Sequence, residues 1–340
     1  MLDRQPPAAG NQEYTALAAT VREAGLLERR FGYYSLRIGS NLALLAAGVV
    51  AFVWLGDTWW QLVVAAFLAF VFAQLGFMGH DAGHRQVCRS RRMNDLVGLL
   101  HANLLTGFSY GWWVTKHNTH HVHTNLEGKD PDIGGGPVAF TADQARAKRG
   151  AARLLARSQA VLFLPLLLLE AINLHVASVK ALRQRRGGAA ATEVALLVVH
   201  AAVYVGAVLG VLSPVRALVF VIVNQGLFGF YLGLTFTTNH VGMPVLSQAE
   251  ELSFLRRQVM TSRDIRGSAM LGFLCGGLNL QIEHHLFPTM PRVNLSRAQA
   301  IVRDFCAQHA IGYQENSVVS AWRDVFRYLH EVGGTVPGIG

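Results

Sequence analysis

Two pairs of long apolar stretches dominate the pattern of hydrophobic and polar positions. The first pair covers residues 41–56 and 61–79, and neither stretch contains a charged side chain. The linker Asp57-Thr58-Trp59-Trp60 separates them. The second pair covers about 193–212 and 216–238, around a Ser213-Pro214 turn. Each stretch approaches the roughly 20 residues that a membrane-spanning helix needs. Because the linkers are short, the pattern predicts four transmembrane helices in two antiparallel hairpins.

Two further apolar segments are predicted to lie along the membrane interface. Residues 159–175 contain Pro165, Glu170 and Asn173 and have basic clusters on both sides, so a crossing would put one cluster on the wrong side. Residues 96–111 are too short to span comfortably. With both segments interfacial, every basic cluster lies on one side, which we assign to the cytoplasm of a cell inner membrane.

Composition supports the same class of protein. Hydrophobic residues make up 51% of the 340 residues and charged residues only 15%, which is unusual for a water-soluble domain. The net charge of +9 is spread in short clusters beside apolar runs, a pattern typical of contact with anionic lipid rather than nucleic acid. The three cysteines are far apart and form no CxxC pair, so neither a zinc finger nor a disulfide framework is indicated. No cleavable secretory signal is expected in residues 1–39.

The expected fold is an all-α integral membrane protein. Its four transmembrane helices are accompanied by interfacial helices and by a cytosolic helical cap that holds a metal site. We expect a cytosolic N-terminal segment at 1–39, the main domain at 40–310 and a cytosolic C-terminal segment at 311–340.

Seven of the fourteen histidines fall in three tight groups, each just beyond a predicted span. Residues three or four apart share one face of a helix, so each group directs its imidazoles towards one point. A structural zinc site closes at four ligands, usually with cysteine, whereas seven imidazoles without cysteine indicate two metal ions. The groups are His80 and His84, then His117, His120 and His121, and finally His284 and His285.

Several neighbours are candidates for supporting roles. His240, at the cytoplasmic end of the last span, is an additional candidate ligand. Gln281 stands where a further histidine would complete HxxHH, and its amide oxygen either ligates weakly or holds a water. The polar residues within the groups, Asp81, Asn118 and Glu283, are candidates to orient the ring nitrogens, or alternatively ordinary helix caps.

Other polar residues are expected to be structural. The acidic segment 125–133 lacks the alternating ligands of a calcium loop, and we expect a solvated turn there. The remaining histidines are isolated by pattern and are expected to be hydrogen-bonded or exposed. They are His101, His123, His175, His200, His309 and His330.

The histidine groups give the chain a family resemblance. The pattern HxxxH, HxxHH and [HQ]xxHH appears as GHDAGHRQ at 79–86, KHNTHHVHTN at 116–125 and NLQIEHHLFPTMPR at 279–292, with DPDI at 130–133. In these motifs the sequence resembles the membrane fatty-acid desaturase family, over about 40–310. A glutamine that opens the third motif is similar to the front-end, linoleoyl-CoA-desaturase-like branch.

This resemblance implies a reaction and its cofactors. The implied activity is O2-dependent desaturation of a fatty acyl-CoA or acyl-lipid by two iron ions in the histidine groups. Many eukaryotic front-end enzymes carry a fused cytochrome b5 domain with an HPGG motif, which is absent here. We therefore expect a separate electron donor, a ferredoxin or a cytochrome b5 with its reductase, on the basic cytoplasmic face.

Two other functions fit part of the pattern. A lipid hydroxylase or other monooxygenase on the same scaffold would need the same histidines, and product analysis separates it from a desaturase. A membrane metal-binding or transport protein would place its histidines along a path inside the spans. Because the three groups all follow spans on one predicted side, the transport interpretation is the weaker one.

Overall fold

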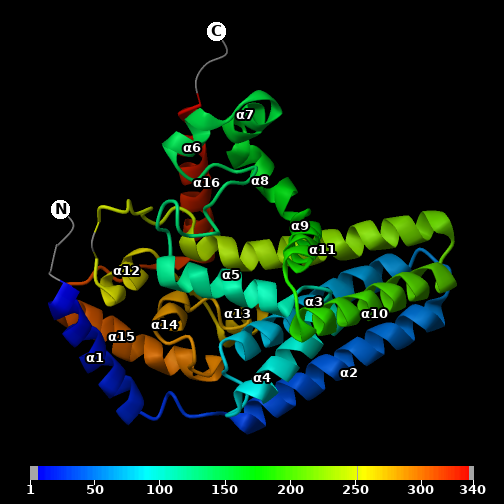
Figure 1. The fold of residues 1–340 in the computed structure, drawn as a ribbon, viewed down its shortest axis with the longest axis horizontal. Coiled ribbons are helices and arrows are strands. Elements are labelled where there is room, and N and C mark those ends of the chain that lie inside the picture. Colours follow the sequence, from blue (N-terminus) through cyan, green and yellow to red (C-terminus); the bar gives the residue numbers. More distant parts are fainter. Residues whose placement is uncertain (1–6, 251, 337–340) are drawn as a thin grey trace. The chain divides into compact units, whose positions relative to one another are not determined.

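The computed structural model describes residues 7–250 and 252–336, and their secondary structure is overwhelmingly helical (Figure 1). Within these residues the strands are β1 (Asp264–Arg266) and β2 (Glu315–Ser317), which pair in parallel. The chain divides into two compact units. We call Arg29–Thr115 with Pro165–Leu234 the span unit, and Met1–Glu28 with Lys116–Leu164 and Thr235–Gly340 the polar unit.

The span unit contains the long apolar helices. Three helices, α5 (Tyr110–His123), α8 (Gln159–Leu167) and α11 (Pro214–His240), run from one unit into the other. The other helices of the span unit are α2 (Phe31–Leu55), α3 (Gln61–Gly83), α4 (Arg91–Gly98), the π-helix η1 (Leu99–Thr106), α9 (Glu170–Gln184) and α10 (Gly188–Val211).

Four helices of the described residues, α2, α3, α10 and α11, are long and apolar enough to cross a membrane. The predicted integral membrane fold is therefore confirmed, although the helices extend beyond the apolar stretches. Helix α2 begins at Phe31, well before residue 41, because its polar positions have partners on α3. Arg37 donates to Gln74 Oε1 at 2.7 Å, and Asn41 donates to Gln74 O at 3.2 Å.

The two hairpins of the span unit pack through a common apolar core. Phe52, Leu68, Val208 and Phe220 are buried together, one from each long helix. Asp57, in the turn of the first hairpin, links it to the turn of the second. It accepts hydrogen bonds from the backbone N–H of Ser213 at 2.9 Å and from Arg216 Nη1 at 2.6 Å.

Each of the two segments predicted to be interfacial contains more than one helix. Residues 159–175 form α8 and the start of α9, and α7 meets α8 at 99°. Pro165 lies inside α8, and the helix ends two residues later because a proline removes a backbone donor and crowds the preceding turn. Residues 96–111 contain η1, which packs against α3 and α10 within the span unit.

The polar unit is built from shorter helices. Helices α1, α12, α14 and α15 surround an apolar core that includes Leu17, Val259, Ile282 and Val302. Helix α16 packs on α6 and α7. The elements are α1 (Pro7–Glu23), α6 (Ala142–Ala147), α7 (Gly150–Arg157), α12 (Phe254–Met260), α13 (Ala269–Leu274), α14 (Gln281–Leu286), η2 (Arg292–Asn294), α15 (Leu295–Gln308) and α16 (Val318–Gly334), with β1 and β2.

Candidate metal centre

The second histidine group lies on the last turns of α5. His117 and His121, four residues apart, share one face of the helix, and their Nε2 atoms are 3.1 Å apart. His120 lies on the adjoining face and is buried. The helix thus presents three imidazoles to the interior of the polar unit.

Within the polar unit, His120 meets two histidines from distant parts of the chain. His240 ends α11 and His285 lies on α14, and one ring nitrogen from each of the three residues lies within 4.8 Å of the others. The ring centroid of His240 lies 4.8 Å from that of His120 and 4.8 Å from that of His285. Three imidazoles at this spacing can share one metal ion.

The Nδ1 atom of each of these three rings faces an oxygen. His120 Nδ1 is 3.0 Å from both carboxylate oxygens of Asp130. The two other rings have neutral acceptors, with His240 Nδ1 3.1 Å from Thr261 O and His285 Nδ1 2.9 Å from Gln258 Oε1. A neutral imidazole ring that donates its hydrogen from Nδ1 keeps a lone pair on Nε2. These contacts therefore orient three Nε2 lone pairs.

The acidic residues near His120 also change its electrostatics. Burial opposes a positive charge on the ring, but the carboxylates of Asp132 and Asp130 outweigh it and raise the pKa of His120. Asp132 in turn pairs with Lys116. A cation at this position would be stabilised by the same carboxylates.

A second set of imidazoles adjoins the first in the polar unit. His117 and His284 have ring nitrogens within 4.8 Å of each other. The ring centroid of His121 lies 4.8 Å from that of His284 and 4.1 Å from that of His285. The second and third histidine groups, predicted from sequence alone, are therefore adjacent.

The first group lies at the end of α3 in the span unit. His80 and His84 are both buried, and their ring centroids are 4.7 Å apart. Trp113 packs edge-on against His80, at 5.4 Å between centroids. Asp81 Oδ1 is 3.3 Å from His80 Nδ1, so Asp81 lies where it can orient this ring.

Gln281 contacts His240 directly. Its amide nitrogen is 3.0 Å from His240 Nε2, while its amide oxygen accepts from Asn239 Nδ2 at 3.2 Å. Asn239 also donates to Leu278 O at 2.9 Å, which fixes its own orientation. In this arrangement the amide of Gln281 donates to a candidate ligand.

The other two residues named as ring-orienting candidates lie elsewhere. Asn118 is exposed on α5. Glu283 is fully buried, and its Oε1 accepts from Tyr313 at 2.9 Å. The Tyr313 hydroxyl also lies 2.5 Å from Asp264 Oδ2, so Glu283 on α14 and Asp264 on β1 belong to one buried carboxyl network.

Residues 128 and 129 of the predicted solvated turn at 125–133 are exposed, but the prediction is wrong for Asp130. Asp130 is 2% exposed and accepts from the backbone N–H groups of Asn125 at 2.7 Å and Asp132 at 2.9 Å. These bonds hold its carboxylate against His120. The DPDI motif was the signal for this role, whereas Gln258 and Thr261 carry no local pattern that would identify them.

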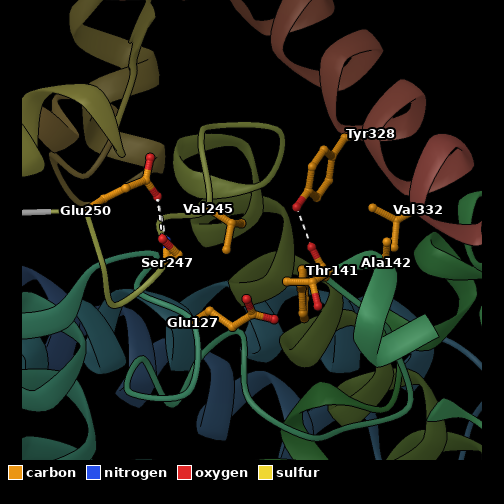
Figure 2. Close-up of a pocket in the computed structure, with 9 residues that line it drawn as sticks. Glu127, Thr141, Ala142, Val245, Ser247, Glu250, Tyr328 and Val332 are labelled. Atoms are coloured by element: carbon orange, nitrogen blue, oxygen red, sulfur yellow. Dashed lines mark hydrogen bonds between the residues drawn. The ribbon is translucent and has the colours of Figure 1, made fainter. Parts of the chain in front are cut away.

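A cavity of ≈ 400 Å³ lies elsewhere in the polar unit (Figure 2). Two hydrogen bonds shape it, from Tyr328 Oη to Phe140 O and from Ser247 to Glu250. None of the described histidines lines this cavity, so it is separate from the candidate centre. Its lining residues are Glu127, Phe140, Thr141, Ala142, Val245, Ser247, Glu250, Tyr328 and Val332.

The chain is similar to several known fatty-acid desaturases. An acyl-lipid (9-3)-desaturase of Physcomitrium patens is 32% identical over 314 residues, which cover 88% of this chain and 58% of the relative. A delta(6)-fatty-acid desaturase of Caenorhabditis elegans is 31% identical over 320 residues, or 89% and 70% of the two chains. A delta(8)-fatty-acid desaturase of Borago officinalis is 29% identical over 329 residues, or 92% and 73%.

The chain therefore spans 58% to 73% of the length of these three relatives. The sequence model of the family described as fatty acid desaturase matches residues 57–317, a range that contains all three histidine groups and His240. The match covers most of the chain and confirms the resemblance found in the histidine motifs. This protein belongs to the fatty acid desaturase family.

Proposed function

We propose that this protein is an O2-dependent fatty acyl desaturase that introduces a cis double bond and holds two iron ions with its histidines. The convergence of His120, His240 and His285 carries the proposal. Membership of the desaturase family makes an oxidoreductase acting on a fatty acid or lipid the natural function for this cluster.

The donor set fits a catalytic metal better than a structural one. Neutral imidazole suits iron, zinc, copper and nickel, and no cysteine from the described residues joins the cluster. Each Nδ1 is engaged by an oxygen, which leaves Nε2 as the ligand atom. The buried rings of His120 and His285 and the half-buried ring of His240 would limit the access of bulk water to the ion.

The proposed ligand set combines the cluster with the other grouped histidines. Spacing along α3 and the family motif support the inclusion of the first group. Gln281 would either ligate weakly through its amide oxygen or hold a water, and in both cases it would give up its contact with His240 Nε2. The set is His80, His84, His117, His120, His121, His240, His284 and His285, with Gln281 as a weak candidate.

The division of labour in the reaction follows from this arrangement. Bound iron would supply the activation of O2 and the removal of hydrogen from an unactivated methylene. Asp130 and Gln258 would hold the rings of His120 and His285 in fixed orientations. The protein would set the position of the double bond by fixing which carbon of the acyl chain lies nearest these rings.

The substrate is proposed to be a fatty acyl-CoA or an acyl group in a membrane lipid. The names of the relatives specify acyl-lipid or fatty-acid desaturation, with positions given as delta(6) and delta(8) in two of them. These names support the front-end interpretation of Gln281 in the third motif.

The electron donor is proposed to be a separate ferredoxin or cytochrome b5 with its reductase. Exposed arginines on the polar unit, including Arg297 and Arg303 on α15 and Arg323 and Arg327 on α16, suit an acidic partner. We propose that this unit faces the cytoplasm from a cell inner membrane, since the basic residues favour that side.

The test combines product analysis with metal analysis. Wild type, His120→Ala, His285→Ala and the control His330→Ala would be expressed in cells fed saturated or polyunsaturated acids, with each candidate donor supplied in turn. His330 is exposed on α16 and makes a suitable control. We expect new double bonds with wild type and the control, and a loss of about 100-fold or more in the other two, with a lower iron-to-protein ratio.

Three outcomes would revise the proposal. Full activity in both His120→Ala and His285→Ala would rule out the assigned centre. Hydroxylated products that require the intact histidines would favour the monooxygenase. Metal binding by wild type without reductant-dependent O2 consumption would favour a metal-binding or transport protein.

A further inference from the structure

Helix α5, which carries three of the proposed ligands, begins directly after a break in regular structure. The π-helix η1 ends at Thr106, and Gly107 adopts a left-handed conformation with φ of 80° before α5 starts at Tyr110. In a membrane protein, backbone groups at such a break must find partners inside the protein. The partners here come mostly from α9 and α10.

Histidines of the span unit bind the carbonyls of this break. His200 Nδ1 is 2.8 Å from Leu104 O, and His175 Nδ1 is 2.8 Å from Gly107 O. A side chain at 107 would meet both rings at 2.8 Å, so only glycine fits between them. These two histidines, isolated in sequence, thus have a structural role.

The backbone N–H groups that follow the same break are bound by a carboxylate, directly and through Ser109. Glu193 lies within α10, one of the apolar helices, and is 2% exposed. Its Oε2 accepts from Ser109 Oγ at 2.6 Å and from the backbone N–H of Gly111 at 3.0 Å. Ser109 Oγ in turn accepts from the N–H of Trp112 at 3.2 Å. Glu193 therefore caps the first turn of α5 from another helix.

The charge of this carboxylate suits its position. The first N–H groups of a helix have no partner within the helix, and the positive end of the helix dipole favours an anion there. Arg185 Nη1 also pairs with Glu193 Oε1 at 2.6 Å. A Cβ atom at Gly111 would lie 2.6 Å from Glu193 Oε1 and 2.5 Å from Arg185 Nη1, so the glycine makes room for the ion pair.

We propose that Glu193 is a positioning residue for the metal centre, acting through the start of α5. The proposal rests on the proposed function, because the residues it positions are the ligands on that helix. His117 is six residues beyond Gly111, or roughly 9 Å along the axis at about 1.5 Å per residue. A change in the direction or rotation of the first turn would therefore reach the imidazoles with little attenuation.

The test compares Glu193→Ala and Glu193→Gln with the control Thr192→Ala. Thr192 is the neighbouring residue on α10, is exposed, and its hydroxyl donates to Gly188 O of its own helix. Glutamine keeps an oxygen acceptor for Gly111 but loses the charge. Ser109→Ala is a milder variant that removes one link and leaves the pair of Glu193 and Arg185 in place.

Two readouts do not depend on activity. Hydrogen exchange of the metal-free protein should be faster at residues 111–114 in Glu193→Ala than in wild type, with Glu193→Gln between them. Iron affinity should fall by about 10-fold to 100-fold in Glu193→Ala and less in Glu193→Gln and Ser109→Ala. The electronic spectrum of the iron-loaded protein should shift most in Glu193→Ala and less in Glu193→Gln and Ser109→Ala. The spectrum of Thr192→Ala should match that of wild type.

The result can be separated from the fate of the desaturase assignment. If wild type binds two irons per chain but forms no double bond, the proposed reaction fails while the positioning role is still decided by iron affinity and exchange. Unchanged exchange at 111–114 together with wild-type iron affinity in Glu193→Ala would overturn the role of Glu193. If Glu193→Ala does not accumulate, the same two measurements on Ser109→Ala decide, and wild-type values there would also overturn it.

Discussion

At the scale of single residues, Asp264 on β1 and Glu283 on α14 form a fully buried pair. Asp264 Oδ1 accepts from the N–H of Ile282 at 3.0 Å, and the hydroxyl of Tyr313 lies within hydrogen-bond distance of both carboxyl groups. Burial raises the pKa of Glu283 well above its usual range, and Asp264 adds to the effect. Burial also raises the pKa of Asp264. The folded protein therefore keeps a proton that the unfolded chain loses.

This pair predicts a pH dependence of stability. A carboxyl whose pKa is higher in the folded state stabilises the fold less as pH rises from about 4.3, its usual pKa, towards the raised value. One such proton is worth up to about 1.4 kcal/mol per pH unit. Glu283→Gln imitates the protonated form, so it should flatten the fall in unfolding temperature between pH 5.5 and 8.

The control for this measurement is Glu331→Gln, at an exposed position on α16. It should retain the slope of wild type. Equal slopes for Glu283→Gln and wild type, measured by thermal unfolding of the detergent-solubilised protein, would contradict the shared proton.

The sequence located the histidines correctly as groups but could not supply their oxygen partners. Spacing of three and four residues on a helix is a local property, and it brings His117 and His121 together regardless of the rest of the fold. Gln258 reaches His285 from 27 residues away, and only the packing of α12 on α14 makes that contact. Long-range contacts of single polar residues leave no periodic signal.

At the scale of helices, α11 packs closely on the start of α9 within the span unit. Gly229 and Gly233 are four residues apart on α11, and a Cβ atom on Gly229 would lie 2.5 Å from Ala171 N and 3.0 Å from Leu167 O. These are backbone atoms, which cannot move without moving the helix. Small residues at this spacing let helices approach closely in membranes.

Gly229→Ala should therefore destabilise the protein by about 1–3 kcal/mol, the usual cost of overpacking. Gly206→Ala is the matched control, because nothing lies within 4 Å of a Cβ atom at that position on α10. Alanine favours a helix over glycine, so the control should be neutral or slightly stabilising. The unfolding temperatures of the two variants in detergent give the comparison, and an equal effect of both would contradict close packing at Gly229.

Helix boundaries were harder to predict than helix positions. Apolar runs located all four long helices, but α10 starts at Gly188, before the predicted start at 193, and it contains the charged Glu193, which pairs with Arg185. The break between α8 and α9 was not predicted, although Pro165 marked its vicinity. Polar residues end an apolar run in the sequence without ending the helix, because tertiary partners satisfy them.

At the scale of the whole molecule, the number of membrane crossings fixes which segments share a side. The described residues contain four helices able to span, or up to five if the bent pair α7 and α8 crosses as one. With four crossings, residues before α2 and after α11 lie on the same side. A fifth crossing at α7 and α8 would put Arg153 and Arg157 inside the crossing and the basic residues of 146–149 and of 180–186 on opposite sides, against the usual bias of Lys and Arg.

Single-cysteine labelling can distinguish these two topologies. After replacement of Cys88, Cys275 and Cys306, one cysteine would be placed at an exposed position between α2 and α3 (Thr58→Cys), on α7 (Ala151→Cys), after α9 (Arg186→Cys) or on α15 (Ser296→Cys). Four crossings with the polar unit in the cytoplasm predict that a membrane-impermeant maleimide labels only the Thr58→Cys protein in intact cells. All four should react after permeabilisation. Opposite accessibility of Ala151→Cys and Arg186→Cys would instead establish a fifth crossing, and would require the bias of basic residues to be overcome by the apolar surface of α8.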